Sequence, residues 1–74
     1  MEEYRIIIGL KLKEYRLKKG YSQRDLAKLS KVSDSAISYY ENGRSIDIDV
    51  LDKLCRALNI DMFDFLNECR KSRI

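Results

Sequence analysis

The chain has 74 residues, a net charge of +3 and 45% hydrophobic residues, and it contains neither proline nor histidine. A chain this short buries only about 60% of the surface that it exposes when unfolded, so we expect one small core and a single domain over residues 1–74. That size leaves no room for the deep pocket of most enzymes, and no run approaches the roughly 18 apolar residues of a membrane-spanning helix.

The spacing of apolar residues predicts an all-α chain. These residues recur at intervals of three and four, as on one face of a helix, and no stretch alternates over more than a few residues. Turn and capping residues divide the chain into five predicted helices, at about residues 3–19, 22–30, 33–41, 47–58 and 61–71. The short connections favour a compact five-helix bundle.

The first helix places Ile8, Leu12 and Tyr15 on one face, the spacing of an amphipathic helix. Gly20 then supplies the left-handed residue that commonly ends a helix. The lysines just before this glycine suit the negative end of the helix dipole.

The second helix begins at Ser22, whose spacing to Asp25 fits a capping box. Leu26 is expected to face inward, followed by either Leu29 or Ser30. The helix is short and ends near residue 30.

The third helix begins at Ser33, another good N-cap, and stops at the turn signal Asn42-Gly43. Ile37 and Tyr40 are the residues that we expect to face inward. The remaining side of this helix is polar.

The fourth helix starts near Asp47 or Asp49, and the fifth starts after Asp61, because aspartate is a preferred N-cap. Each carries an apolar stripe at i, i+3, i+4 and i+7: Leu51, Leu54, Cys55 and Leu58 in the fourth, and Met62, Phe65, Leu66 and Cys69 in the fifth. The two cysteines form no CxxC motif, so we expect buried, reduced thiols. A disulfide or a redox switch is the alternative.

The second and third helices are the most informative part of the chain. Helices of about eight residues are marginal alone, but a helix-turn-helix holds such a pair at a fixed angle and presents the second helix to the major groove of DNA. The motifs in and around this pair are Gly20-Tyr21-Ser22-Gln23-Arg24-Asp25-Leu26-Ala27, Val32-Ser33, Ala36-Ile37-Ser38, Tyr40-Glu41-Asn42-Gly43-Arg44 and Leu51-x-x-Leu54-x-x-Ala57-Leu58-Asn59-Ile60. On these motifs the chain resembles the repressor/Cro-like (XRE-type) helix-turn-helix family over roughly residues 8–66.

The resemblance implies a lambda-repressor-like DNA-binding domain whose contacts come from the second and third helices and the loop that follows. The implied DNA-binding residues are Gln23, Asp34, Ser35, Ser38, Tyr39, Asn42 and Arg44. Gln23 matches a glutamine that contacts a phosphate at the start of the second helix. Asn42 and Arg44 lie in the loop that meets the DNA backbone, and the other four lie on the exposed side of the third helix.

Sequence preference is harder to assign. Asp34 can accept a hydrogen bond from a cytosine amino group, or it can support the positive end of the helix dipole. The reading positions of the third helix hold no Arg, Asn or Gln, so the strongest bidentate base contacts are missing there. Charge nevertheless fits a nucleic-acid partner, because residues 1–46 carry ten Lys/Arg and six Asp/Glu, a net +4, whereas residues 47–74 carry a net −1.

Four residues are expected to shape the fold instead of contacting a ligand. Arg16 and Glu41 match a buried ion pair that, in the resembling family, ties the first helix to the third. Lys31 stands where many members have glycine, so a left-handed lysine is expected at a cost on the order of 1 kcal/mol. Gly43 is expected to need a positive φ or a close backbone approach.

A second copy of the chain is the expected partner on DNA. One small module buries about 600–1,000 Å² on DNA, which seldom gives tight specific binding. Two half-sites would lie about 34–36 Å apart. The candidate interface is the apolar group Ile60, Met62, Phe63, Phe65 and Leu66, which alternatively closes the core of the monomer.

We therefore predict a cytoplasmic, sequence-specific regulator of transcription that binds double-stranded DNA. It is expected to act as a homodimeric repressor on a palindromic operator, with or without a protein co-regulator. The alternative is a protein-interaction module, an antitoxin or anti-regulator, in which DNA binding is secondary. No histidine, nucleophile–base pair or metal-ligand cluster is apparent, so we expect no enzymatic activity, no cofactor and no metal ion.

Overall fold

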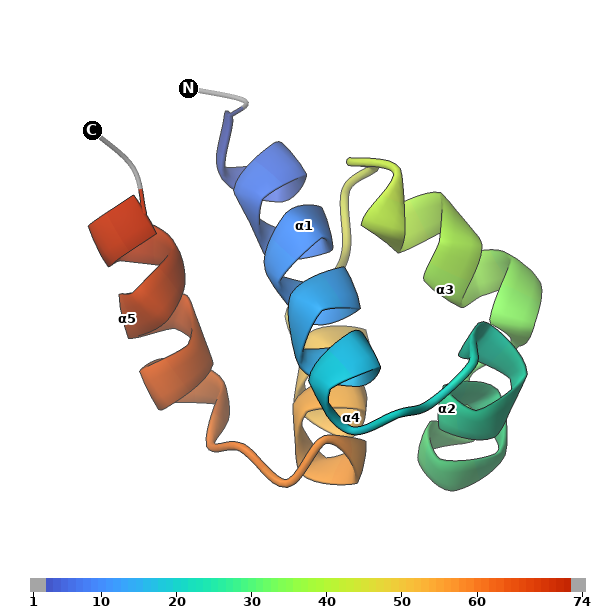
Figure 1. The fold of residues 1–74 in the computed structure, drawn as a ribbon. Helices are drawn as coiled ribbons and strands as arrows, with labels where there is room; N and C mark the ends of the chain where they lie inside the picture. The colour runs from blue at the N-terminus through green and yellow to red at the C-terminus, as the bar shows by residue number, and fades with distance from the viewer. Residues whose placement is uncertain (1–2, 73–74) are drawn as a thin grey trace.

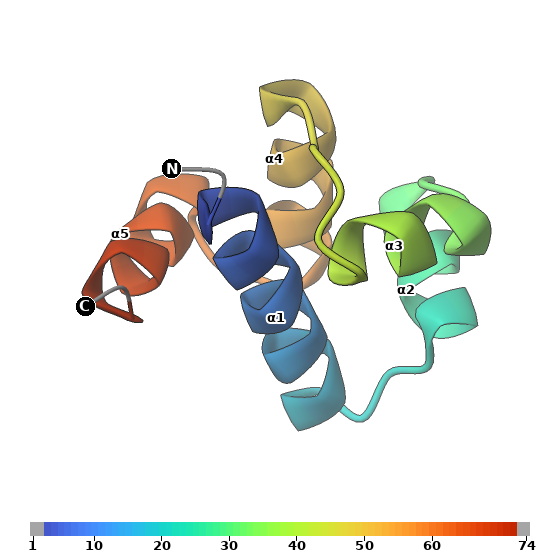
Figure 2. The same cartoon turned by 90° about the horizontal axis from the view of Figure 1, so that it is seen from above.

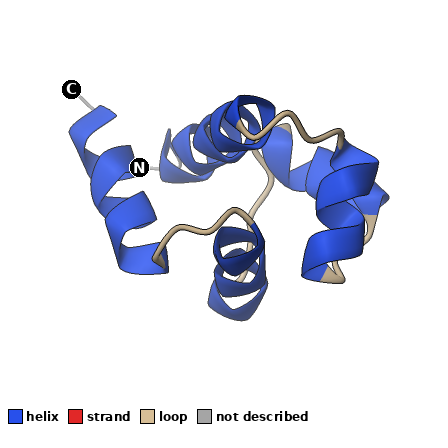
Figure 3. Ribbon diagram, turned by 60° about the horizontal axis from the view of Figure 1, so that its bottom comes forward, coloured by secondary structure: helices blue, strands red, loops and turns tan. Residues whose placement is uncertain are grey.

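The computed structural model describes residues 3–72, and helices are its only regular structure over that range (Figures 1 and 3). In chain order these are α1 (Glu3–Lys18), α2 (Gln23–Ser30), α3 (Asp34–Glu41), α4 (Ile48–Ala57) and α5 (Met62–Ser72). The five predicted helices are confirmed, each with its ends within two residues of the expected ones. The outer limits of the expected domain, residues 1–2 and 73–74, lie outside the described residues.

Side-chain caps fix where the helices begin. Ser22 and Asp25 form the predicted capping box, with the Asp25 N–H donating to Ser22 Oγ at 3.0 Å and the Ser22 N–H donating to Asp25 Oδ2 at 2.9 Å. Ser33 caps α3 through the N–H of Ala36 at 3.1 Å. Of the two aspartates considered for α4, Asp47 is the cap. Each cap satisfies an amide donor that the helix itself leaves without a partner.

The helices pack as a closed ring around the core. Helix α1 lies between α3 and α5, as Figures 1 and 2 both show, and it runs opposite to α5. Helix α2 packs against α3 and α4, and α4 packs against α5, which closes the ring. Each helix therefore has two main neighbours, and the pair α2–α3 is held by α1 on one side and α4 on the other.

Every helix contributes to one apolar core. Its buried hydrophobic residues are Leu12, Leu26, Val32, Ile37, Leu51, Leu54, Cys55, Leu58, Phe65 and Cys69. The ring of Tyr15 packs against that of Phe65, with centroids 5.8 Å apart. Both cysteines are buried and free, as predicted.

Gly9 lets α1 approach α3 closely. A Cβ at this position would stand 2.4 Å from the carbonyl oxygen of Tyr40 and 3.1 Å from that of Glu41. Any larger residue would force the two backbones apart, since real Cβ atoms do not come so near a carbonyl oxygen. The glycine thus sets the depth at which α3 sits on α1.

The structure corrects one expectation about burial and decides between two alternatives for another. Phe65, expected at an interface between two copies, is completely buried in the core, so it closes the monomer and cannot contact a partner. On α2 the inward residue is Ser30, whereas Leu29 is 54% exposed. The Ser30 hydroxyl oxygen accepts a hydrogen bond from the Val32 N–H at 3.2 Å. This bond offsets the free-energy cost of removing the hydroxyl from water.

Within residues 3–72, no helix has both the length and the apolar character needed to cross a lipid bilayer.

Candidate nucleic-acid interface

The turn between α2 and α3 depends on a left-handed lysine. Lys31 has φ 65° and ψ 20°, and its N–H donates to the Ala27 carbonyl at 2.9 Å, which ends α2. Val32 then inserts into the core, and Ser33 caps the next helix. The predicted left-handed conformation of Lys31 is confirmed, and three residues, 31–33, connect the two helices.

One buried carboxylate holds three helices together. Arg16 of α1 donates to Glu41 at the end of α3, from Nε to Oε2 at 2.7 Å and from Nη2 to Oε1 at 2.9 Å. Both side chains are almost fully buried, as the resemblance implied. Gln23, the first residue of α2, also donates to Glu41 Oε1, at 3.1 Å. Arg16 uses its remaining Nη1 on the Tyr21 carbonyl, at 2.8 Å.

This arrangement stabilises the charged form of Arg16. The hydrogen bond to Glu41 raises the pKa of Arg16 further above its usual range. Every polar side-chain atom buried within residues 3–72 has a hydrogen-bond partner. The Arg16–Glu41 pair is therefore part of a fully hydrogen-bonded network that fixes α3 against α1. We expect it to determine the position of α3 more than to increase the free energy of unfolding.

The side of α3 that faces away from the core carries the predicted reading residues. Ser35 and Tyr39 are exposed, and Asp34 and Ser38 are half-buried beside them. Ile37 packs on the opposite side, in the core. The helix therefore presents a polar face at its N-terminal end, the end that meets base edges in helix-turn-helix complexes.

Tyr39 and Arg44 form a contact at the far end of this face. The guanidinium carbon of Arg44 lies 5.6 Å from the centre of the Tyr39 ring, a cation–π arrangement. The ring of Tyr39 also meets that of Tyr40 edge-on, with centroids 5.9 Å apart. The Arg44 side chain thus lies against the exposed face of α3, although the residue itself is three positions beyond the end of the helix.

The loop after α3 is fixed from both sides. Asn42 donates from its side chain to the Ser38 carbonyl at 2.9 Å. Gly43 has φ 91°, the positive value expected for it, and packs closely on Ile6 of α1. The Gly43 carbonyl accepts a hydrogen bond from Arg5 Nη1 at 2.6 Å. These contacts hold the exposed Arg44 at a defined place beside α3.

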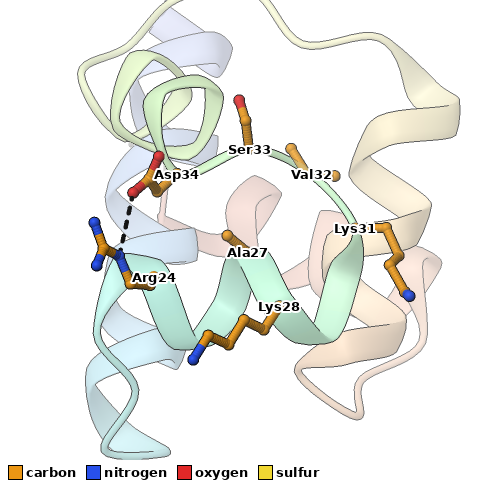
Figure 4. A pocket seen from close by; sticks show the side chains of 7 residues that line it. All are labelled: Arg24, Ala27, Lys28, Lys31, Val32, Ser33 and Asp34. Carbon is orange, nitrogen blue, oxygen red and sulfur yellow. Dashed lines mark ion pairs between the residues drawn. The ribbon is translucent and has the colours of Figure 1, made fainter.

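A shallow hollow of about 450 Å³ opens between α2 and the start of α3 (Figure 4). It is lined by Arg24, Ala27, Lys28, Lys31, Val32, Ser33 and Asp34. Arg24 and Asp34 form an ion pair across it, with Nε and Oδ2 3.8 Å apart. Three of the lining residues are cationic and one is anionic, so the hollow adds positive charge beside the polar face of α3.

The structure thus brings six of the seven predicted DNA-binding residues onto α3 and the loop after it, and it places Gln23 apart at the start of α2. The contacts that were not predicted include Gln23 with Glu41, Arg24 with Asp34, and Arg5 with Gly43. Helical periodicity cannot reveal them, because each joins two elements through long side chains whose directions depend on packing. Among residues 3–72 no group of three or more His, Cys, Asp or Glu is arranged to hold a metal ion.

A short helix pair joined by a three-residue turn, with its second helix presenting a polar face flanked by arginines, defines the helix-turn-helix class of DNA-binding domains. Comparison with known families agrees with this geometry. The chain belongs to the XRE-type helix-turn-helix family, whose model, described as Helix-turn-helix, matches residues 12–65.

Several characterised proteins are similar to this chain. The HTH-type transcriptional regulator SinR of Bacillus licheniformis is 34% identical over 64 residues, which are 84% of this chain and 58% of SinR. The chain thus spans little more than half the length of that relative. The crystal structure of the clp gene regulator ClgR from C. glutamicum matches with a TM-score of 0.86 and 32% identity, over 96% of this chain and 94% of that one.

A third match is a complex with DNA. It is the restriction-modification controller protein C.Esp1396I, crystallised as a tetramer with its natural 35 base-pair operator. The TM-score is 0.83 with 29% identity, and the alignment covers 92% of this chain and 91% of that one.

Proposed function

We propose that this protein is a transcription regulator that binds double-stranded DNA in a sequence-specific way, with α3 in the major groove. The observation that carries the proposal is the exposed polar face of α3, which the buried Arg16–Glu41 pair holds at a fixed place on the domain. Family membership supports it, as does the similarity to the regulators SinR and ClgR and to the controller protein C.Esp1396I.

Each predicted residue has a role in this proposal. Ser35, Asp34 and Tyr39 face the base edges, with Ser38 beside them. Gln23 contacts a phosphate near the start of α2, where the amides of a helix N-terminus favour an anion. Its bond to Glu41 leaves one amide hydrogen for that contact. Asn42 and Arg44 bind the backbone at the other end of α3.

A homodimer on a palindromic operator completes the proposal. Phe63 is 71% exposed, the highest value among the large apolar residues that the structure describes, and Ile60, Met62 and Leu66, close to it in sequence, are half-buried. These four residues are the proposed interface, without Phe65. Half-sites about 34–36 Å apart would then face the two copies of α3.

The biological role follows from the same geometry. A small domain that covers an operator leaves little surface for recruiting polymerase, so we infer repression by occlusion. We also infer a cytoplasmic location, because a bacterial regulator meets its DNA there. Nothing in the proposal requires a cofactor or a catalytic step.

The test is selection from a pool of random duplex DNA, with the bound species sized and the affinity followed against salt. An enriched palindrome with half-site centres about one helical turn apart is the expected result. Tight binding only at low salt, with no enriched sequence, would indicate a surface that recognises phosphates alone. That outcome would overturn sequence-specific regulation and favour the alternative of a protein-interaction module.

A further inference from the structure

We propose that Arg24 of α2 is a specificity-determining residue that reads a guanine, and that Asp34 of α3 positions it. The inference rests on the proposed function, since it concerns how the same surface selects its DNA. It adds a residue outside the third helix to the set that contacts bases. It also changes the role of Asp34 from reading a base to holding an arginine.

The geometry places the Arg24 guanidinium at the start of α3. Its Nε lies 3.8 Å from Asp34 Oδ2, and the two residues come from different helices of the motif (Figure 4). The arginine side chain is 78% exposed and the aspartate side chain 45% exposed. An ion pair so open to water adds little stability, so its main effect is on where the guanidinium points.

The paired arginine keeps the donors that base reading needs. The nearest approach to Asp34 is through Nε, and within residues 3–72 no hydrogen bond joins the Nη1 and Nη2 groups of Arg24 to another residue. Two parallel N–H groups of a guanidinium match O6 and N7 of guanine, the commonest specific contact in the major groove. The start of α3 is the part of a recognition helix that meets base edges.

The composition of α3 makes such a supplement necessary. The side of α3 that faces away from the core carries Asp34, Ser35, Ser38 and Tyr39, none of which makes a strong bidentate contact with guanine. A lone carboxylate at the start of the helix would also face the phosphates of the groove. Pairing with Arg24 neutralises that charge, so the acidic residue becomes compatible with DNA.

The experiment compares the selected DNA sequences of the wild type with those of Arg24→Ala, Arg24→Lys, Asp34→Ala and the double variant Arg24→Ala/Asp34→Ala. We expect Arg24→Ala to lose roughly 5- to 150-fold of preference for guanine at one symmetric pair of positions. Arg24→Lys keeps the charge but lacks the fork, so it should keep the salt dependence and lose the same preference. Asp34→Ala should weaken that same preference, and the double variant should add little to Arg24→Ala.

Arg56→Ala is the matched control. Arg56 is 79% exposed and is paired with an aspartate, Asp52, at 2.9 Å, and both residues lie on α4, outside the two helices of the motif. It should leave every base preference unchanged. Urea unfolding of all variants verifies that each one is folded before binding is measured.

Three results would overturn the inference, and they are distinguishable. If the wild type enriches no sequence, the proposed function fails and this inference fails with it. If the wild type is selective but Arg24→Ala weakens all sequences equally and lowers the salt slope by about 1, Arg24 contacts a phosphate. If Asp34→Ala alters a different base position, or its effect adds fully to that of Arg24→Ala, Asp34 reads a base by itself.

Discussion

Arg16 and Glu41 face each other across the interface of α1 and α3 and share two hydrogen bonds, at 2.7 and 2.9 Å. The same carboxylate accepts a third bond from Gln23 on α2. Three helices thus converge on one buried charge, and α2 and α3 are both located by it. This buried contact, on the side of α3 opposite the proposed DNA-binding face, therefore determines where that face lies on the domain.

Removing one partner of this pair should be costly. Glu41→Ala leaves the Arg16 guanidinium buried without its counter-charge, so we expect the free energy of unfolding to fall by roughly 3–5 kcal/mol. Urea denaturation followed by circular dichroism measures the change. The double variant Arg16→Met/Glu41→Leu removes both charges and should lose less than Glu41→Ala alone. If the double variant has a lower free energy of unfolding than Glu41→Ala, the ion pair itself contributes net stability in addition to positioning α3.

Gly9→Ala tests the close approach of α1 to α3. Alanine is favoured over glycine inside a helix by about 1 kcal/mol, yet its Cβ would lie 2.4 Å from the Tyr40 carbonyl oxygen. Overpacking of this kind typically costs about 1–3 kcal/mol, so we expect a net loss of stability in thermal or urea unfolding. Lys13→Ala, at an exposed position of the same helix, is the control and should be close to neutral. An increase in stability for Gly9→Ala would show that α3 shifts without cost.

The exposed face of α3 is tested by Ser35→Ala together with Tyr39→Ala. Both residues are exposed, so the fold should remain intact while affinity for the selected operator falls. Loss of the Tyr39 ring also removes the cation–π contact that positions Arg44. Fluorescence anisotropy with operator and scrambled duplexes separates a loss of selectivity from a general loss of affinity. Unchanged affinity for the operator in a folded variant would argue for the protein-interaction alternative.

Phe63→Asp should produce a monomer. A charge at this exposed position disfavours an apolar contact between copies, and it leaves the core untouched because Phe63 is 71% exposed. Sedimentation velocity across a concentration series measures the oligomeric state. Leu10→Asp provides the control, since Leu10 is 61% exposed on α1. A dimer that survives Phe63→Asp and dissociates with Leu10→Asp would place the interface on α1 instead.

The buried thiols predict a loss of stability at alkaline pH. Burial raises the pKa of Cys55 to about 12 and that of Cys69 to about 11, from an ordinary value of 9.0. Well below pH 9.0 both thiols are protonated whether the chain is folded or unfolded. Above it, the unfolded chain releases these protons and the folded chain does not, so the free energy of unfolding falls.

Urea unfolding between neutral pH and about pH 10, under reducing conditions, measures this dependence. Cys55→Ala should show a shallower fall than the wild type, although its stability at neutral pH is lower because of the cavity. Equal slopes for the two proteins would show that other groups, such as lysines and tyrosines, account for the alkaline effect.

Most of the helical architecture could be predicted from the sequence because its signals are local. Ser22, Ser33 and Asp47 cap the helices within hydrogen-bond reach of their own first turns, and apolar spacing at three and four marks each inner face. The left-handed residue Lys31 followed from its place in the motif. Each of these features depends on a few residues close together in the sequence, so a short stretch of sequence is enough to predict it.

Contacts between elements were the part that the sequence could not specify. Phe63 and Phe65 are chemically alike and two positions apart, yet one is exposed and the other is fully buried. The choice depends on which face of α5 meets α1 and α4. Gly9 did carry a signal, since a glycine inside a helix is unfavourable unless a close approach requires it. The hydrogen bond from Arg5 to the Gly43 carbonyl joins residues 38 positions apart, and no comparable feature of the sequence predicts it.

The ring in which the helices pack, each against two main neighbours, has a consequence for how binding competence is lost. Helices as short as α2 and α3 have little stability when separated from their neighbours. Opening any one contact exposes the shared core, so the domain should melt in a single cooperative step. The recognition surface then exists only as a property of the whole native state. Bound operator accordingly acts as a folding ligand, which raises the melting temperature in proportion to the logarithm of its concentration.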